Sequence, residues 1–178
     1  WNQHELAELA FQAERLYLSV SGGWQDQYAT VFGGFNFMEF RMEENIVHPL
    51  KIQNEILLEL EESLVLCDTK LSHNSGEIHL DQKAEMLNPE IWSQVGSNVA
   101  LTYRIRNHLL RGNLLDFGRC LHEAWQYKRK LSPKITNTQL DTIYELALEN
   151  GAIGGKLLGA GGGGFFLFYV PPFKKHML

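Results

Sequence analysis

Two short segments of this 178-residue chain carry residues whose types and spacing could do chemistry. The first reads Gly-Gly-Trp-Gln-Asp-Gln at residues 22–27, and it places one carboxylate, Asp26, at the predicted start of a helix. A carboxylate in that position could accept the proton of a bound hydroxyl, and the helix dipole would favour its ionised form. The same position is also typical of a side chain that caps the helix. This segment alone leaves both interpretations of Asp26 open.

The second segment is a run of glycines, Gly-Ala-Gly-Gly-Gly-Gly at residues 159–164. Its composition would fit a flexible linker, but apolar runs at 156–158 and 165–170 that read as buried strands flank it. Glycines in such a loop permit positive φ and let backbone amides approach another group closely. The Gly-x-Gly-x-x-Gly spacing is followed by a strand where a dinucleotide site needs a helix, and no Lys-Ser/Thr pair follows. We therefore predict a structured, site-lining loop of another type.

Hydrophobic periodicity predicts the elements that position these two segments. Helices are predicted over residues 2–18, 25–31, 56–60 and 136–150, with two or three more between about 82 and 130. Strands are predicted over residues 35–41, 46–52 and 64–67, and on both sides of the glycines. The polar residues 68–80 predict a loop. Helices and short antiparallel-type strands mix without regular βαβ alternation, so the predicted fold class is α+β.

Composition limits the classes of function. The net charge of -5 argues against a nucleic-acid binder, because such proteins usually carry a basic face. Cys67 and Cys120 are far apart, which indicates reduced thiols and a reducing compartment. We find neither a bilayer-spanning apolar run nor a signal peptide, so no membrane association is predicted and a cytoplasmic location is expected. The seven histidines form no metal-like cluster, and no metal site is predicted.

Both candidate segments resemble motifs of one family. Residues 22–28, with Phe-Gly-Gly at 32–34, resemble the aspartate motif of the GHMP kinases, which are the galacto-, homoserine, mevalonate and phosphomevalonate kinases. Residues 156–164 resemble the third motif of this family, in the family's order and at about its separation. Within the family, the first motif is similar to that of the D-glycero-D-manno-heptose 7-phosphate kinases and fucokinases. Residues 28–36 and 125–132 are more similar to the heptose kinases.

The resemblance covers nearly the whole chain and implies a fold. Residues 61–178 would form the ferredoxin-like C-terminal domain, and residues 1–60 would be the tail of the ribosomal S5-like N-terminal domain. The chain starts at Trp1 inside a helical pattern and stops shortly after a strand, so we expect a piece of a longer protein. The family's N-terminal half carries the Pro-x-x-x-Gly-Leu-Gly-Ser-Ser loop that holds ATP, and normally Mg²⁺ ligands. That motif does not occur in this sequence, so the isolated chain is expected to be inactive.

The resemblance also implies a reaction, which is transfer of a phosphoryl group from ATP with Mg²⁺ to the C1 hydroxyl of a heptose 7-phosphate. Such a reaction feeds surface glycans such as lipopolysaccharide, and the partners would be the sugar phosphate and ATP. Asp26 would be the catalytic residue. The substrate-binding residues would be Gly22, Gly23, Gln25, Gly161, Gly162 and Gly163.

Two basic residues near the end of a predicted helix are candidates to bind phosphate. Lys128 and Arg129 could contact the 7-phosphate, although basic residues at a helix C-terminus also complement the helix dipole. A fucokinase-like enzyme that acts on another sugar is the alternative within the class. From a different class, the chain could be a non-catalytic binding module of the same fold. Oligomeric state is not predicted.

Overall fold

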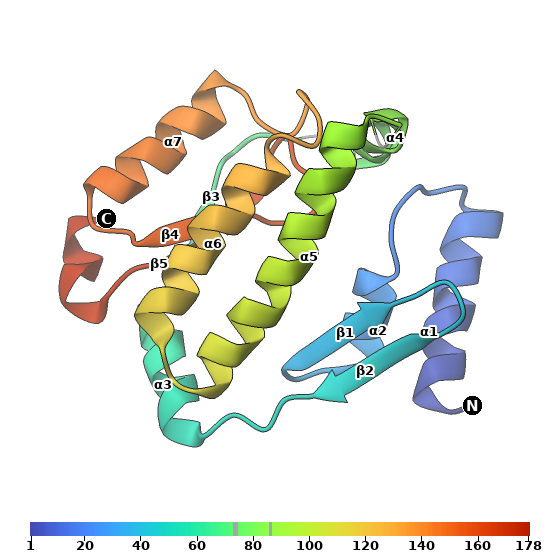
Figure 1. The fold of residues 1–178 in the computed structure, drawn as a ribbon, viewed down its shortest axis with the longest axis horizontal. Helices are drawn as coiled ribbons and strands as arrows, with labels where there is room; N and C mark the ends of the chain where they lie inside the picture. The colour runs from blue at the N-terminus through green and yellow to red at the C-terminus, as the bar shows by residue number, and fades with distance from the viewer. Residues whose placement is uncertain (73–74, 86) are drawn as a thin grey trace. The chain divides into compact units, whose positions relative to one another are not determined.

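The computed structural model describes residues 1–72, 75–85 and 87–178 (Figure 1). The chain divides into two compact units, Trp1–Lys51 and Ile52–Leu178. Helices and antiparallel strands are mixed along the chain without βαβ repeats, which confirms the predicted α+β class. The expected boundary between family domains near residue 60 stays a prediction.

The first unit contains two helices and a hairpin. Its elements are α1 (Gln3–Gln12), a π-helical turn (Ala13–Tyr17), α2 (Gln25–Phe32), β1 (Asn36–Phe40) and β2 (Asn45–Pro49). The strands pair antiparallel, as predicted, with Met38 opposite Val47. The predicted helix over 2–18 is a regular α-helix only as far as Gln12, because the following five residues widen into the π-helical turn.

Tyr28 holds α2 in place within this unit. Its ring is fully buried and stacks on Phe32 at a centroid separation of 5.8 Å, while Phe40 of β1 meets it edge-on. Its hydroxyl accepts a hydrogen bond from Asn45 Nδ2 at 3.1 Å and donates one to Glu8 at 3.3 Å. Tyr28 therefore ties α2 to both α1 and the hairpin, which fixes the helix that carries Asp26.

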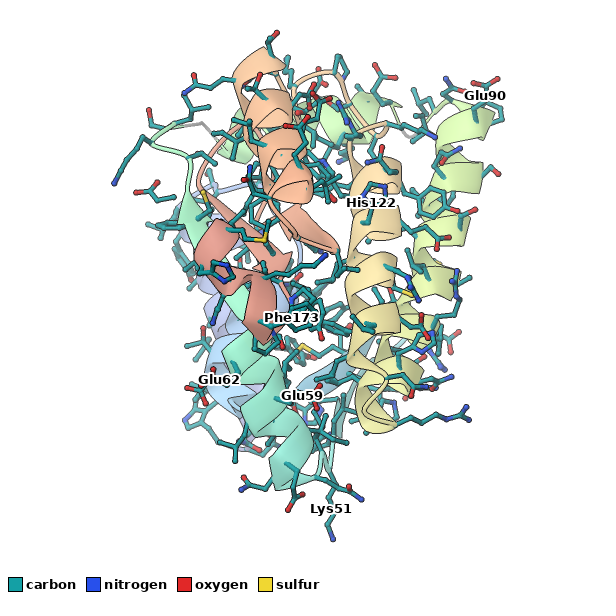
Figure 2. All side chains as sticks on the ribbon, turned by 90° about the vertical axis from the view of Figure 1, so that its left-hand side faces the viewer. Lys51, Glu59, Glu62, Glu90, His122 and Phe173 are labelled. Atoms are coloured by element: carbon teal, nitrogen blue, oxygen red, sulfur yellow. The ribbon has the colours of Figure 1, made fainter. Side chains whose placement is uncertain are left out.

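The second unit packs helices against a three-stranded antiparallel sheet of order β3-β5-β4. Its elements are α3 (Asn54–Ser63), β3 (Leu64–Asp68), α4 (Ser75–Glu85), α5 (Pro89–Leu110), α6 (Leu114–Lys128), α7 (Thr138–Glu149), β4 (Gly154–Leu157), β5 (Phe165–Tyr169) and a final 3-10 helix (Pro172–Met177). Figure 2 shows the final 3-10 helix, labelled at Phe173, beside α3, labelled at Glu59 and Glu62. The loop predicted over 68–80 is wrong from residue 75 onward, where α4 begins, and His73 and Asn74 lie outside the described residues.

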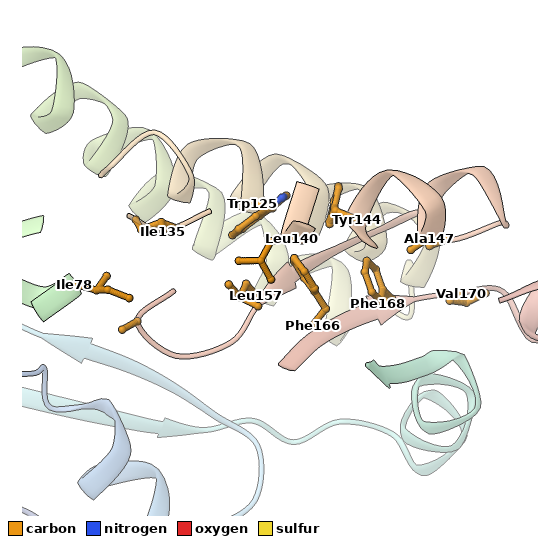
Figure 3. Close-up of a cluster of buried hydrophobic side chains, with 12 residues drawn as sticks. Ile78, Trp125, Ile135, Leu140, Tyr144, Ala147, Leu157, Phe166, Phe168 and Val170 are labelled. Carbon is orange, nitrogen blue, oxygen red and sulfur yellow. The ribbon is translucent and has the colours of Figure 1, made fainter. Parts of the chain in front are cut away.

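The core of the second unit is aromatic (Figure 3). Phe166 and Phe168 alternate along β5, so both point to the same face of the sheet, where they contact Tyr144 of α7. Trp125 of α6 meets Phe166 edge-on at 5.4 Å. These four rings are all buried. They join α6 and α7 to the strand that follows the glycine loop.

Two glycines let α6 approach the edge of the sheet. A Cβ on Gly154 of β4 would lie 2.2 Å from the carbonyl oxygen of Gly118 on α6, and a Cβ on Gly118 would lie 2.6 Å from Cδ1 of Tyr169. Such distances leave room for hydrogen only, which is why both positions are glycine. The close approach brings the C-terminal end of α6 next to the end of β4, where the glycine loop begins. No helix in the described part of the chain is long and apolar enough to cross a bilayer.

Candidate active site

Asp26 is the second residue of α2, and its side chain does not cap the helix. Trp24 occupies the N-cap position without a side-chain hydrogen bond to the backbone, so the cap interpretation of Asp26 is wrong. The residue is exposed, and the structure records no hydrogen bond or ion pair between its carboxylate and any described residue. The carboxylate therefore lies in the first turn of a helix, where the dipole favours negative charge, and is available to a ligand.

The loop before Asp26 is held by Arg15, which stands in the π-helical turn. One guanidinium nitrogen donates to the carbonyl oxygen of Gly23 at 2.7 Å, and another donates to that of Val20 at 2.6 Å. A Cβ on Gly22 would lie 2.7 Å from Arg15 Nη2, so the glycine makes room for the guanidinium group. Gly22, Gly23 and Gln25 are all exposed, so a ligand can reach them.

Aromatic stacking supports the same loop. The ring of Trp24 lies parallel to that of Phe11 at 3.6 Å, and the Arg15 guanidinium carbon lies 4.8 Å from the centre of the Phe11 ring. Gln27 is buried, and neither its side-chain oxygen nor its nitrogen has a partner among the described residues. Sequence reasoning missed both Arg15 and Gln27. In the sequence, Arg15 is marked only by its place in the predicted helix over 2–18. Gln27 is marked only by its place in the predicted helix over 25–31.

The glycine loop is an ordered structure of the second unit. Gly162 donates its amide N–H to the carbonyl oxygen of Ile135 at 2.8 Å, and Gly164 donates to that of Leu71 at 3.0 Å. A Cβ on Gly163 would lie 2.4 Å from the Leu71 oxygen. The structured-loop interpretation is therefore confirmed, because a flexible linker would make none of these contacts.

Alternate amides in the loop face different surroundings. The N–H groups of Gly162 and Gly164 bond within the chain, whereas those of Gly161 and Gly163 have no recorded partner among the described residues. Gly161 and Gly163 are nevertheless buried. Buried backbone N–H groups are nearly always paired, so the two amides are candidates to bind an acceptor that is absent from the described residues.

Lys128 contacts the glycine loop directly. Its Nζ donates to the carbonyl oxygen of Leu157 at 2.9 Å and to that of Gly159 at 2.5 Å. Burial lowers the pKa of Lys128 to about 7, and the nearby charge of Lys156 adds to this effect. Burial also lowers the pKa of Lys156.

Arg129 is engaged by its own surroundings. It forms an ion pair with Asp141 of α7 at 2.7 Å, and its guanidinium carbon lies 5.9 Å from the Trp125 ring. Each of the two basic residues predicted to contact phosphate thus has partners of its own, and their contact with a phosphate stays a prediction. The predicted site residues fall into two groups, the aspartate segment in the first unit and the glycine loop with Lys128 and Arg129 in the second.

Comparison with known proteins finds a family similarity for the segment that holds the second group. The family model described as GHMP kinases C terminal matches residues 106–174, a range that includes α6, α7, β4, the glycine loop and β5. Residues 106–174 are therefore similar to the C-terminal domain of the GHMP kinases. The predicted resemblance to this family is thereby confirmed.

Individual relatives extend the similarity to nearly the whole chain. The chain is 38% identical, over 99% of its length, to D-glycero-alpha-D-manno-heptose 7-phosphate kinase from Campylobacter jejuni, and it spans about half (52%) of that protein. It is 28% identical to a bifunctional fucokinase/GDP-fucose pyrophosphorylase from Arabidopsis thaliana, over 98% of this chain and 17% of that protein. A solved structure of a D-glycero-D-manno-heptose 1-phosphate kinase from Bacteroides thetaiotaomicron matches with a TM-score of 0.70 and 33% identity, over 98% of this chain and 47% of that one.

Proposed function

We propose that this chain contributes the aspartate segment and the glycine loop to a sugar kinase, which transfers a phosphoryl group from ATP to the C1 hydroxyl of a heptose 7-phosphate. The observation that carries the proposal is the 38% identity, over 99% of the chain, to a kinase named for heptose 7-phosphate. The unengaged carboxylate of Asp26 supports it, because a kinase must accept or orient the proton of the attacking hydroxyl.

Asp26 is proposed to orient the acceptor hydroxyl and to accept its proton. A carboxylate that forms no ion pair within its own unit can make a new hydrogen bond without first breaking an old one. Gly22, Gly23 and Gln25 are proposed to contact the sugar from the same exposed segment. Most of the rate enhancement in phosphoryl transfer comes from positioning and charge neutralisation, so the firm support of this segment by Arg15 is consistent with the role.

The backbone of Gly161, Gly162 and Gly163 is proposed to approach the substrate. The amides of Gly161 and Gly163, which have no recorded partner among the described residues, suit an oxygen acceptor such as a phosphate or a sugar hydroxyl. Contact of Lys128 or Arg129 with the 7-phosphate stays a separate prediction. Each would then have to bind phosphate in addition to its present partners.

The residues of this chain do not account for ATP binding. The Gly-Leu-Gly-Ser-Ser type of phosphate loop is absent from the sequence, and the described residues hold no cluster of three His, Cys, Asp or Glu side chains that could bind a metal ion. We therefore expect the 178-residue chain to show no ATP turnover with any sugar, and turnover by the purified chain would contradict this expectation. A cytoplasmic location and a role in surface-glycan synthesis also belong to the proposal.

A fucokinase-like activity is the second candidate, and the 28% identity to a bifunctional fucokinase favours it. A coupled ADP-release assay on the product of the complete gene separates the two, with heptose 7-phosphate, fucose, mannose and galactose as acceptors. The proposal predicts the highest kcat/KM with heptose 7-phosphate. A higher value with fucose would support the second candidate, and no turnover with any acceptor would favour a non-catalytic binding module.

A further inference from the structure

Lys128 is the last residue of α6, and its side chain is half-buried in the second unit. The two carbonyl oxygens that it contacts belong to Leu157, the last residue of β4, and to Gly159, the first glycine of the loop. These oxygens stand on either side of Leu158. The ammonium group therefore bridges the point where the strand passes into the loop.

The rest of the loop is anchored by neutral groups. Gly164 is held at the far end by the Thr69 hydroxyl, which donates to its carbonyl oxygen at 2.7 Å. The side-chain amide of Gln82 donates to the carbonyl oxygen of Ala160 at 3.2 Å, and Ile135 accepts from Gly162. Lys128 adds a charged donor at the β4 end of the loop. Hydrogen bonds from a charged donor are shorter and stronger than those between neutral groups.

A partly buried ammonium group is costly to keep, which points to a role. Burial of a charge without a counter-ion disfavours the folded state, and the structure records no carboxylate partner for Lys128 among the described residues. Lys156, on the adjacent strand, adds a repulsive charge. A methionine or leucine would fill the same space without this cost, so the hydrogen bonds to the loop are what a lysine adds at this position.

We propose that Lys128 is a positioning residue, whose ammonium group fixes the start of the glycine loop and thereby sets the direction of the Gly161–Gly163 backbone. The proposal rests on the proposed function, since it assigns Lys128 an effect on catalysis through that loop. This positioning role of Lys128 differs from the predicted contact of Lys128 with the 7-phosphate in the kinetic constant that it affects. A phosphate ligand changes the affinity for the phosphorylated sugar, whereas a loop anchor changes turnover.

Two measurements test this proposal separately. The first is the ¹H–¹⁵N NMR spectrum of the glycine amides at 159–164 in this chain. The second is the kcat and the KM for sugar and ATP of the complete gene product. The variants are Lys128→Met, which removes the donors, Lys128→Arg, which retains them, and Lys128→Gln, which serves if the methionine variant does not fold. Lys130→Met is the matched control, because Lys130 lies two residues along and is exposed.

The expected result is a shift of several loop amide signals in Lys128→Met, with a loss in kcat of about 10- to 100-fold, as for other small misplacements of catalytic groups. KM for the sugar should change less than about threefold, and Lys128→Arg should recover most of both effects. Unchanged loop signals in folded Lys128→Met or Lys128→Gln would overturn the proposal. So would a rise in KM for the phosphorylated sugar alone, since that identifies a phosphate ligand. If the wild-type protein turns over no sugar, the proposed function fails, while the NMR measurement still decides whether Lys128 holds the loop.

Discussion

Substitution of Gly163 by alanine tests whether the glycine loop is packed or free. The new Cβ would lie 2.4 Å from the carbonyl oxygen of Leu71, whereas ordinary contacts begin near 3.4 Å, so the two segments must separate by about 1 Å. Gly163 does not have a positive φ, so the effect is one of space and not of backbone strain. Overpacking of this kind costs about 1–3 kcal/mol. Loss of the adjacent hydrogen bond from Gly164 to Leu71 adds about 1 kcal/mol.

We therefore expect Gly163→Ala to lower the free energy of unfolding by about 2–4 kcal/mol, which corresponds to a Tm lower by roughly 5–12 °C. Urea denaturation followed by tryptophan fluorescence is a suitable assay, because Trp125 is fully buried in the same unit. Gly96→Ala is the control. Gly96 lies inside α5 with no atom within 4 Å of an added Cβ, so alanine there should stabilise by about 0.5–1 kcal/mol. A change below about 0.5 kcal/mol in Gly163→Ala would refute the packed loop and restore the linker interpretation.

Three further substitutions test the surroundings of the loop by urea denaturation. Tyr144→Phe removes the hydroxyl that contacts Gly155 O at 3.2 Å and His122 Nδ1 at 2.9 Å, so the free energy of unfolding should fall by about 1–3 kcal/mol; a change near zero would contradict this network. Asn137→Ala removes the cap that accepts from the Leu140 amide at 3.0 Å, at a cost of about 1 kcal/mol, and no loss would contradict the cap. Lys128 has a folded pKa of about 7 against an ordinary value of 10.5, so between these values the unfolded chain binds more protons. The free energy of unfolding should therefore rise with pH in that window, by at most about 1.4 kcal/mol per pH unit from this group. Lys128→Met should show a smaller rise than Lys130→Met, and equal slopes would contradict burial of the ammonium group.

Several elements could be predicted because their sequence patterns are local. Alternating aromatics predict a strand of the hairpin in the first unit, and the apolar runs on both sides of the glycines predict β4 and β5. The 3.6-residue period and the Asn150-Gly151 stop gave α7, which ends at Glu149 with Asn150 as its C-cap. Each of these signals lies within the segment that it predicts, so no knowledge of tertiary contacts was needed.

What was missed depends on contacts between distant residues or on small changes of helix geometry. Lys128 bonds to carbonyl groups 29 and 31 residues away, and no periodicity encodes such a contact. Arg15 reaches Gly23 because the helix widens into a π-turn at Ala13, which the apolar stripe does not reveal. Asp26 was compatible with a cap because a one- or two-residue shift of a helix start is invisible in sequence. The predicted helix begins at Gln25, as observed, and Trp24 takes the N-cap position.

The most direct test of the proposed function is the turnover of Asp26→Asn in the complete gene product, measured by coupled ADP release with heptose 7-phosphate at saturating ATP. Asparagine preserves the shape of the exposed side chain and removes its charge and its ability to accept a proton. We expect kcat to fall at least about 100-fold while KM for ATP changes less than about threefold. A kcat within about twofold of the wild-type value would contradict it and remove Asp26 from the chemistry.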